Sequence, residues 1–200
     1  MFQSTLSIAQ KIARIDDEVR FIRSWLERPL ATGAVMPSGR PLARAMAHCV
    51  DPDPPGPVIE LGPGTGAVTA ALVERGIKPS RMVLVEFNAT FCRLLRTRYP
   101  EATVIQGDAY RIQHLLGGLL REPAAAVVSG LPLQTKPFRQ RTRLIDEAFE
   151  LMAPNAPFVQ FTYAMVTPIP KRASHKITAL ASELVWQNLP PARVWVYRKG

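Results

Sequence analysis

Long apolar runs and cysteines are both scarce in this sequence. No stretch reaches the roughly 18 consecutive apolar residues that a membrane-spanning helix needs, and the first residues lack the long apolar segment of a secretory signal. The cysteines, Cys49 and Cys92, are too few for a disulfide framework and have no metal-ligand spacing. These absences predict a reduced, cytoplasmic chain that does not span a membrane and holds no metal.

Acidic residues are outnumbered by basic ones. The 200 residues contain 25 Lys and Arg against 16 Asp and Glu, which gives a formal net charge of +9. Such an excess favours an anionic partner. Nucleic acid and an anionic membrane surface both satisfy it, and so does a basic protein with neither partner. The length and the hydrophobic fraction of 47% are typical of one folded domain.

Residues 1–30 have the pattern of an amphipathic helix that Pro29 ends. Apolar positions recur there in alternating steps of four and three, which is the period of one helical stripe. The stripe consists of Ile8, Ile12, Ile15, Val19, Ile22 and Leu26, and is widened by Phe21 and Trp25. Basic side chains line the rest of the helix, which suits the plane of an anionic membrane interface. Packing of the same stripe on a protein core is the alternative that the residues leave open.

Apolar strands and helices alternate through residues 31–200. We expect strands at 57–61, 81–87, 102–109, 124–132 and 156–164, and helices at 41–50, 67–75, 89–98, 110–120 and 138–152. Near-continuous apolar strands separated by helices predict an α/β fold with a parallel sheet buried on both faces. The final segments, SELVWQN and ARVWVYRK, predict an antiparallel pair that completes a seven-stranded sheet.

The stretch VIELGPGTG, residues 58–66, places three glycines at the end of the first expected strand. Its G-x-G-x-G spacing differs from the G-x-G-x-x-G of a dinucleotide turn, and no Lys-Ser/Thr pair follows it as in a P-loop. Glu60 precedes the turn, and a carboxylate there repels phosphate and favours a cationic ligand. Glu86 and Asp108 end the next two strands. Carboxylates at these points can accept hydrogen bonds from ribose hydroxyls and from an adenine amino group, with the Ala109 N–H as an added donor.

With these glycines and acids, residues from about 40 to 200 resemble the class I S-adenosylmethionine-dependent methyltransferases, which have a Rossmann-like fold. The resemblance implies S-adenosylmethionine as the cofactor and S-adenosylhomocysteine as the product. It implies that the glycine turn surrounds the methionine part, Glu86 holds the ribose and Asp108 holds the adenine. The cofactor-binding residues expected on this basis are Thr32, Gly33, Ala34, Glu60, Gly62, Gly64, Thr65, Gly66, Glu86, Phe87, Asp108, Ala109, Ser129 and Gly130.

The fourth strand ends in SGLPLQ, which bears on the identity of the methyl acceptor. Amine- and adenine-methylating members of the family have Asn/Asp-x-Pro and then an aromatic residue at this point. Here Ser129 replaces the Asn or Asp and Leu133 replaces the aromatic, so no clamp for a flat base is visible. The SGLP turn resembles the ribosomal RNA adenine dimethylases in backbone shape. Those enzymes carry a helical domain after the sheet, whereas this chain is expected to end with the sheet. An RNA adenine N-methyltransferase is therefore the alternative function and not the first choice.

The order of parts along the whole chain resembles the bacterial phospholipid N-methyltransferases. The parts are the basic amphipathic helix, GAVMPSGRPLARAMA, ELGPGTG, SGLP and QFTY. The resemblance implies stepwise methylation of the phosphatidylethanolamine amine towards phosphatidylcholine by a cytoplasmic enzyme, peripheral on the inner face of the cell membrane. Membrane phospholipids and their anionic surface are then the partners, and nucleic acid is not expected. The residues expected to enter the membrane are Phe21, Ile22, Trp25 and Leu26.

Two residues are expected to face the reacting amine. The Tyr163 hydroxyl would accept a hydrogen bond, and its ring would stabilise the methylated cations; a core tyrosine is the alternative. The Leu131 carbonyl would hold the amine N–H. Candidate cations for a lipid phosphate are Arg40, Lys171 and Arg172, with a solvated surface position as the alternative for each. Alignment of a neutral amine with the sulfonium would supply most of the rate without a metal or a covalent enzyme intermediate.

Overall fold

The computed structural model describes residues 39–169, 177–188 and 190–199, which belong to one compact unit. The expected helix of residues 1–30, with its membrane-binding positions, lies outside the described residues. The same holds for five expected site residues, which are Thr32, Gly33, Ala34, Lys171 and Arg172. Of the helices in the described ranges, none is both long and apolar enough to cross a membrane.

Seven strands form one sheet in the order β3-β2-β1-β4-β5-β7-β6. Along the chain they are β1 (Val58–Leu61), β2 (Met82–Glu86), β3 (Thr103–Gln106), β4 (Ala126–Ser129), β5 (Phe158–Thr162), β6 (Ile177–Val185) and β7 (Ala192–Lys199). The first five strands pair in parallel, and β7 lies antiparallel between β5 and β6. This topology confirms the predicted Rossmann-like methyltransferase fold with its antiparallel end.

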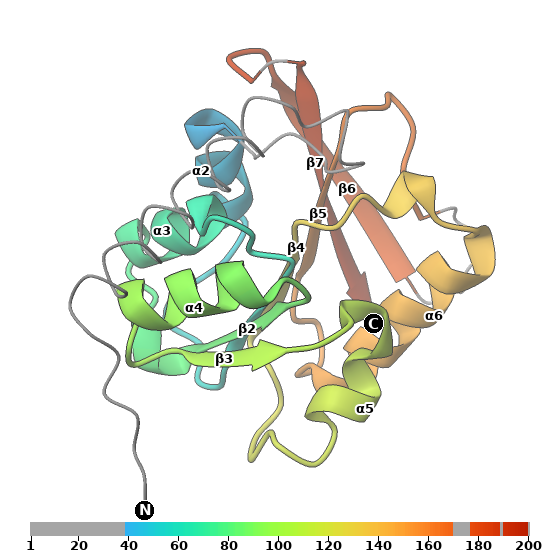
Figure 1. Cartoon of the computed structure of the whole chain (residues 1–200). Helices are drawn as coiled ribbons and strands as arrows, with labels where there is room; N and C mark the ends of the chain where they lie inside the picture. The colour runs from blue at the N-terminus through green and yellow to red at the C-terminus, as the bar shows by residue number, and fades with distance from the viewer. Residues whose placement is uncertain (1–38, 170–176, 189, 200) are drawn as a thin grey trace, which may run out of the picture. The chain divides into compact units, whose positions relative to one another are not determined.

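Helices cover both faces of the sheet (Figure 1). One face carries α2 (Arg40–His48), α3 (Ala67–Glu74) and α4 (Ala89–Arg98), and the other carries α5 (Ile112–Leu116) and α6 (Phe138–Leu151). Short 3-10 helices occur at η1 (Pro79–Arg81), η2 (Ala109–Arg111) and η3 (Leu133–Thr135). Strand side chains alternate between the two layers. Ile59 and Leu61 pack in the core with α5 and α6, whereas Glu60 is turned to Thr69 of α3.

Two elements differ from their expected ranges. β6 covers Ile177–Val185, whereas a strand was expected at 182–188, and residues 186–188 form the turn before β7. β6 is one of the two edge strands. Its Leu180 is 68% exposed and its register shifts between Ala181 and Leu184, so it lacks the apolar run that marks a buried strand. The helix expected at 110–120 ends at Leu116, because Gly117 and Gly118 do not favour its continuation.

The strand order reverses at β1, which lies between β2 and β4. In open α/β sheets, ligands bind beyond the carboxyl ends of the strands at such a reversal. The chain leaves β1 at Gly62, ends β2 at Glu86 and ends β4 at Ser129. These three strand ends therefore define the region of the candidate site.

Candidate active site

The glycine turn follows β1 directly and is fixed by its own backbone. The Gly62 N–H donates to the Val85 carbonyl at 2.9 Å, and the Gly66 N–H donates to the Pro63 carbonyl at 2.9 Å. Gly62, Gly64 and Gly66 have φ angles of 69°, 56° and 82°, in the left-handed region that residues with a side chain seldom adopt. The G-x-G-x-G spacing therefore reflects a backbone conformation, and it brings main chain rather than side chains to the strand end.

Glu86 joins this turn to the start of α4. Its side chain is 7% exposed. One carboxylate oxygen accepts from the Gly64 N–H at 3.0 Å, and the other accepts from the Asn88 N–H at 2.7 Å. The Asn88 side chain in turn accepts from the first N–H groups of α4. The carboxylate expected at the ribose is thus held in contact with the glycine turn.

Glu60 is enclosed between β1 and α3. Its side chain is 1% exposed, and it accepts a hydrogen bond from the Thr69 hydroxyl at 2.8 Å. Burial raises the pKa of Glu60 to about 8; the Thr69 hydrogen bond opposes this rise, and the negative charge of Glu86 adds to it. A cation bound at the turn would favour the ionised form of both acids. The carboxyl group nevertheless faces α3 rather than the open end of the strand.

Residues after β2 and β3 form the other side of the site. Asp108 is exposed, and its carboxylate accepts from the Tyr110 N–H at 3.0 Å, while Ala109 is buried. Phe87 follows Glu86 directly and is 76% exposed, so its ring does not belong to the core. An exposed aromatic ring beside two acid-bearing strand ends is available for stacking on a flat ligand.

The turn after β4 touches the glycine turn. The Gly130 N–H donates to the Leu61 carbonyl at 2.8 Å, and a Cβ on Gly130 would lie 2.7 Å from the Gly62 carbonyl oxygen. Only glycine permits this approach. Counted back from Pro132, the Asn/Asp position of Asn/Asp-x-Pro falls on Gly130, so the expectation that Ser129 replaces this residue was wrong. Ser129 is fully buried, and its hydroxyl lies 3.4 Å from the Leu131 nitrogen.

A core residue occupies the position of the aromatic clamp. Leu133 is 2% exposed and packs in the cluster that includes Leu144 and Ile145 of α6. Gly130 has no side chain to offer. Neither position therefore presents a group that would stack on or pair with a flat base, in keeping with the expectation from SGLPLQ.

Gln160 was not expected in the site, yet it contacts the Leu131 carbonyl. This β5 side chain is fully buried, and its Nε2 donates to the carbonyls of Leu131 at 2.9 Å and Phe161 at 2.8 Å. Its Oε1 has no donor among the described residues. The QFTY motif contained the residue, but the contact joins positions 29 residues apart and depends on the pairing of β4 with β5.

Tyr163 follows β5 and is partly buried. Its ring meets Phe161 edge-on, with 5.3 Å between centroids. Burial raises the pKa of Tyr163, and the nearby Asn188 side chain opposes the rise. Asn188 also accepts from the Gly39 N–H at 3.0 Å, which links the β6–β7 turn to the start of α2. Within the described residues, no hydrogen bond or ring contact joins Tyr163 directly to Leu131, and their expected placement at the amine stays a prediction.

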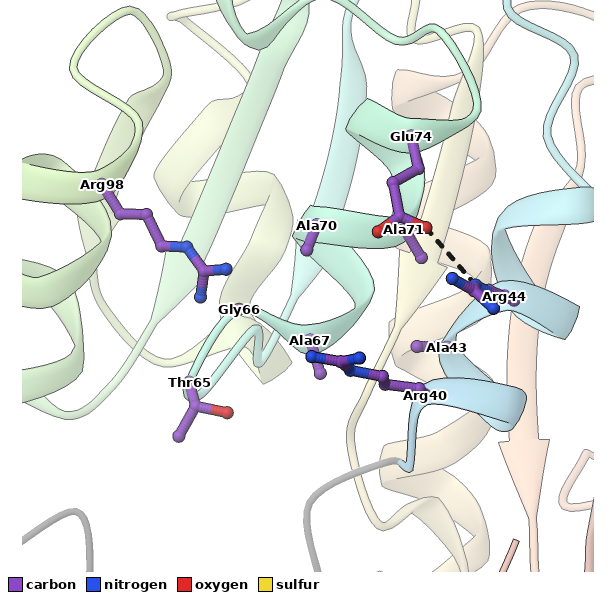
Figure 2. A pocket seen from close by; sticks show the side chains of 10 residues that line it. All are labelled: Arg40, Ala43, Arg44, Thr65, Gly66, Ala67, Ala70, Ala71, Glu74 and Arg98. Atoms are coloured by element: carbon purple, nitrogen blue, oxygen red, sulfur yellow. Dashed lines mark hydrogen bonds and ion pairs between the residues drawn. The ribbon is translucent and has the colours of Figure 1, made fainter. Parts of the chain in front are cut away.

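Arg40, the first residue of α2, is exposed and lines a hollow beside the glycine turn (Figure 2). Thr65 and Gly66 line the same hollow. Arg98, at the end of α4, lines it too, although nothing in its local sequence indicates a site.

The residues at the strand ends fit a cationic nucleoside in their chemistry. The turn supplies closely approachable backbone, Glu86 supplies a fixed carboxylate and Phe87 supplies an exposed ring. Carboxylates near the turn favour a positively charged sulfonium over a phosphate. The arrangement can thus hold S-adenosylmethionine.

Comparisons with known proteins point in the same direction. A family model described as ribosomal RNA adenine dimethylase matches residues 42–118. An ornithine lipid N-methyltransferase from Singulisphaera acidiphila is 27% identical over 183 residues, which cover 89% of this chain and 94% of that protein. A ribosomal RNA small subunit methyltransferase A from Synechococcus sp. is 30% identical over 138 residues, covering 63% of this chain. The matched part is only 45% of that ribosomal RNA methyltransferase.

The solved structures agree on the fold. A TehB-like S-adenosylmethionine-dependent methyltransferase from Corynebacterium glutamicum aligns over 92% of this chain and 99% of its own, with a TM-score of 0.59 and 14% identity. At that identity the likeness concerns the fold alone. The fold, the glycine turn and the relatives together indicate the cofactor, whereas the identity of the methyl acceptor depends on the geometry of the site.

Proposed function

Because the chain is a class I S-adenosylmethionine-dependent methyltransferase, we propose that it methylates the amine of a membrane lipid, phosphatidylethanolamine and its mono- and dimethylated forms. The observation that carries the proposal is the turn after β4, where Leu133 is buried and Gly130 has no side chain. A flat base needs a stacking surface, whereas an alkyl amine needs only a hydrogen-bond acceptor and alignment. The relative named ornithine lipid N-methyltransferase supports a lipid acceptor, so ornithine lipid is the second acceptor to test.

The cofactor would be held by the residues that surround the glycine turn. We assign the ribose to Glu86, the adenine to Asp108, Ala109 and Phe87, and the methionine part to the turn itself. The remaining assigned residues are Glu60, Thr65, Ser129 and Gly130, together with Thr32, Gly33 and Ala34 as a lid. Bound S-adenosylmethionine supplies an electrophilic methyl group and leaves as S-adenosylhomocysteine.

The chain's part in the reaction is to orient a neutral amine. The carbonyl oxygen of Leu131 has two lone pairs, and the hydrogen bond from Gln160 leaves one of them for an amine N–H. On accepting a methyl group the nitrogen would become cationic. The product of a primary or secondary amine would release a proton to water, whereas the dimethylated amine, which has no N–H, would become a quaternary ammonium and keep its charge. The Tyr163 ring would stabilise that cation. Orientation of this kind supplies most of the rate.

Access to the lipid would come from the helix of residues 1–30, lying in the inner face of the cell membrane. Phe21, Ile22, Trp25 and Leu26 would enter the interface, as a basic amphipathic helix does. Lys171, Arg172 and Arg40 would meet lipid phosphate. Trp25→Ser should weaken binding of the full chain to anionic liposomes; unaltered binding would contradict this assignment.

The second candidate is an RNA adenine N-methyltransferase, favoured by the family model over residues 42–118 and by the net charge of +9. Incubation with methyl-labelled S-adenosylmethionine separates the two. We expect label in extracted lipid when phosphatidylethanolamine or ornithine lipid is offered in neutral micelles, and none in ribosomal RNA. Label in RNA alone would replace the proposal with the second candidate.

A further inference from the structure

A hollow of about 350 Å³ lies between α2, α3 and the end of α4, beside the glycine turn (Figure 2). Arg40 and Arg98 reach towards the turn at Gly66 from two sides. Four alanines line the hollow, and their short side chains leave the space open. They are Ala43, Ala67, Ala70 and Ala71.

The hollow has an excess of positive charge. Among its described lining residues Glu74 is the single carboxylate, and it pairs with Arg44 at 3.3 Å. Within the described ranges, neither Arg40 nor Arg98 has an ion-pair partner; the Arg98 guanidinium lies 5.5 Å from the Tyr99 ring centroid. Among the residues that the structure describes, no acid therefore compensates these two guanidinium groups at the opening.

The basic surface continues beyond this opening. A second hollow of about 290 Å³ shares Arg44 and Glu74 with the first and adds His48 and Arg75. The surface thus follows the outer side of α2 and α3, and its residues come from segments that lie far apart in the sequence. None of the described residues that line the two hollows is aromatic. Proteins that bind single-stranded nucleic acid usually pair basic grooves with aromatic rings, so this surface is better suited to phosphate groups alone.

We infer that the hollow between Arg40 and Arg98 binds the phosphate of an anionic membrane lipid and so docks the catalytic domain itself on the membrane. The inference rests on the proposed lipid methyltransferase function, and it adds a contact independent of residues 1–30. Guanidinium groups bind phosphate through paired N–H donors. The position beside Gly66 would bring the cofactor turn close to the lipid surface from which the acceptor comes.

Co-sedimentation of the full chain with vesicles tests the inference. Arg40→Gln with Arg98→Gln is compared with a matched double variant, Arg121→Gln with Arg139→Gln, which removes the same charge from exposed positions outside the hollow. Vesicles contain equal parts of phosphatidylcholine and phosphatidylglycerol, at a salt concentration where half of the wild-type protein is bound. We expect the partition coefficient to fall about tenfold for the hollow variant and less than about twofold for the control, since basic residues near an anionic surface each strengthen binding.

Equal losses in the two double variants would show general charge attraction and overturn the inference, as would no loss in the hollow variant. A loss of ribosomal RNA binding without a loss of vesicle binding would also overturn it, in favour of nucleic acid. Thermal unfolding of each variant checks that the fold is retained. Methyl transfer to lipid in neutral micelles is measured separately on the wild type. Vesicle docking through the hollow without lipid methylation would refute the proposed function alone. Lipid methylation without vesicle docking through the hollow would refute this inference alone.

Discussion

The position of the Leu131 carbonyl depends on the buried amide of Gln160. Gln160→Met keeps a similar volume but removes the donors to Leu131 and Phe161, which are 2.9 Å and 2.8 Å away. We expect kcat for lipid methylation to fall by about tenfold to a hundredfold, because small displacements of a positioning group are costly. The affinity for S-adenosylhomocysteine, measured by titration calorimetry, should change less than about twofold.

A matched control separates positioning from loss of packing. Val159→Ala alters the preceding buried residue of β5, whose side chain points to the opposite face of the sheet. It should lower the thermal stability and leave kcat close to the wild-type value. A Gln160→Met protein that is folded and retains wild-type kcat would show that the Leu131 carbonyl does not need this support.

Glu86 has a different role from Gln160, because both of its carboxylate oxygens accept hydrogen bonds from backbone N–H groups. Glu86→Gln places an amide NH2 against one of those donors, the N–H of Gly64 or of Asn88. A buried donor then lacks an acceptor, which costs about 1–3 kcal/mol. We expect S-adenosylhomocysteine binding to weaken at least tenfold. Glu74→Gln, at an exposed ion pair of α3, is the control, and equal affinities in the two variants would contradict the assignment.

The turn at the end of β4 and the glycine turn after β1 act as one structural unit. Gly130→Ala would place a Cβ 2.7 Å from the Gly62 carbonyl oxygen, which is backbone and can move only with its turn. Overpacking of this kind costs about 1–3 kcal/mol. We expect lower stability to urea and weaker S-adenosylhomocysteine binding together. Gly118→Ala is the control, because a Cβ there meets nothing within 4 Å, and a stability loss equal to that of Gly130→Ala would refute the explanation.

Elements whose signals are local could be predicted from the sequence. α4 was expected at 89–98 and β7 at 192–199, and the structure has both at these limits. The first five strands were located within a few residues; four of them, β1, β2, β4 and β5, are buried along their whole length. β6 was displaced, since it lies at an edge of the sheet and lacks the apolar run of a buried strand. Contacts that join distant segments were not predictable: Gln160 meets Leu131 through strand pairing, and Arg98 reaches the hollow because the end of α4 lies close to Gly66.

The sequence also did not predict to which face of the sheet the Glu60 side chain points. Glu60 was expected at the strand end because the motif places an acid before the glycines. On β1, however, neighbouring side chains alternate between the two helical layers, and Glu60 falls on the α3 side, where Thr69 binds it. Sequence spacing could identify the acid but not which layer would enclose it.

For the molecule as a whole, the enclosed Glu60 couples folding to pH. Its pKa is about 8 in the folded chain, against an ordinary value of 4.5. Between these values the folded chain binds a proton that the unfolded chain has lost, so this group makes the free energy of unfolding fall as the pH rises. The contribution is fully present below about pH 4.5 and is lost as the pH passes about 8.

Glu60→Gln isolates this effect, since glutamine keeps the shape of the protonated acid and can still accept from Thr69. We expect the variant to match the wild type near pH 4 and to exceed it above pH 8 by on the order of a few kcal/mol. Urea unfolding without cofactor measures the difference at each pH, because a bound cation would favour the ionised carboxylate and obscure it. Glu74→Gln should leave the wild-type pH profile in place. Parallel profiles for Glu60→Gln and the wild type would mean that Glu60 titrates as an ordinary carboxyl, and that a fold enclosing it tolerates the charge.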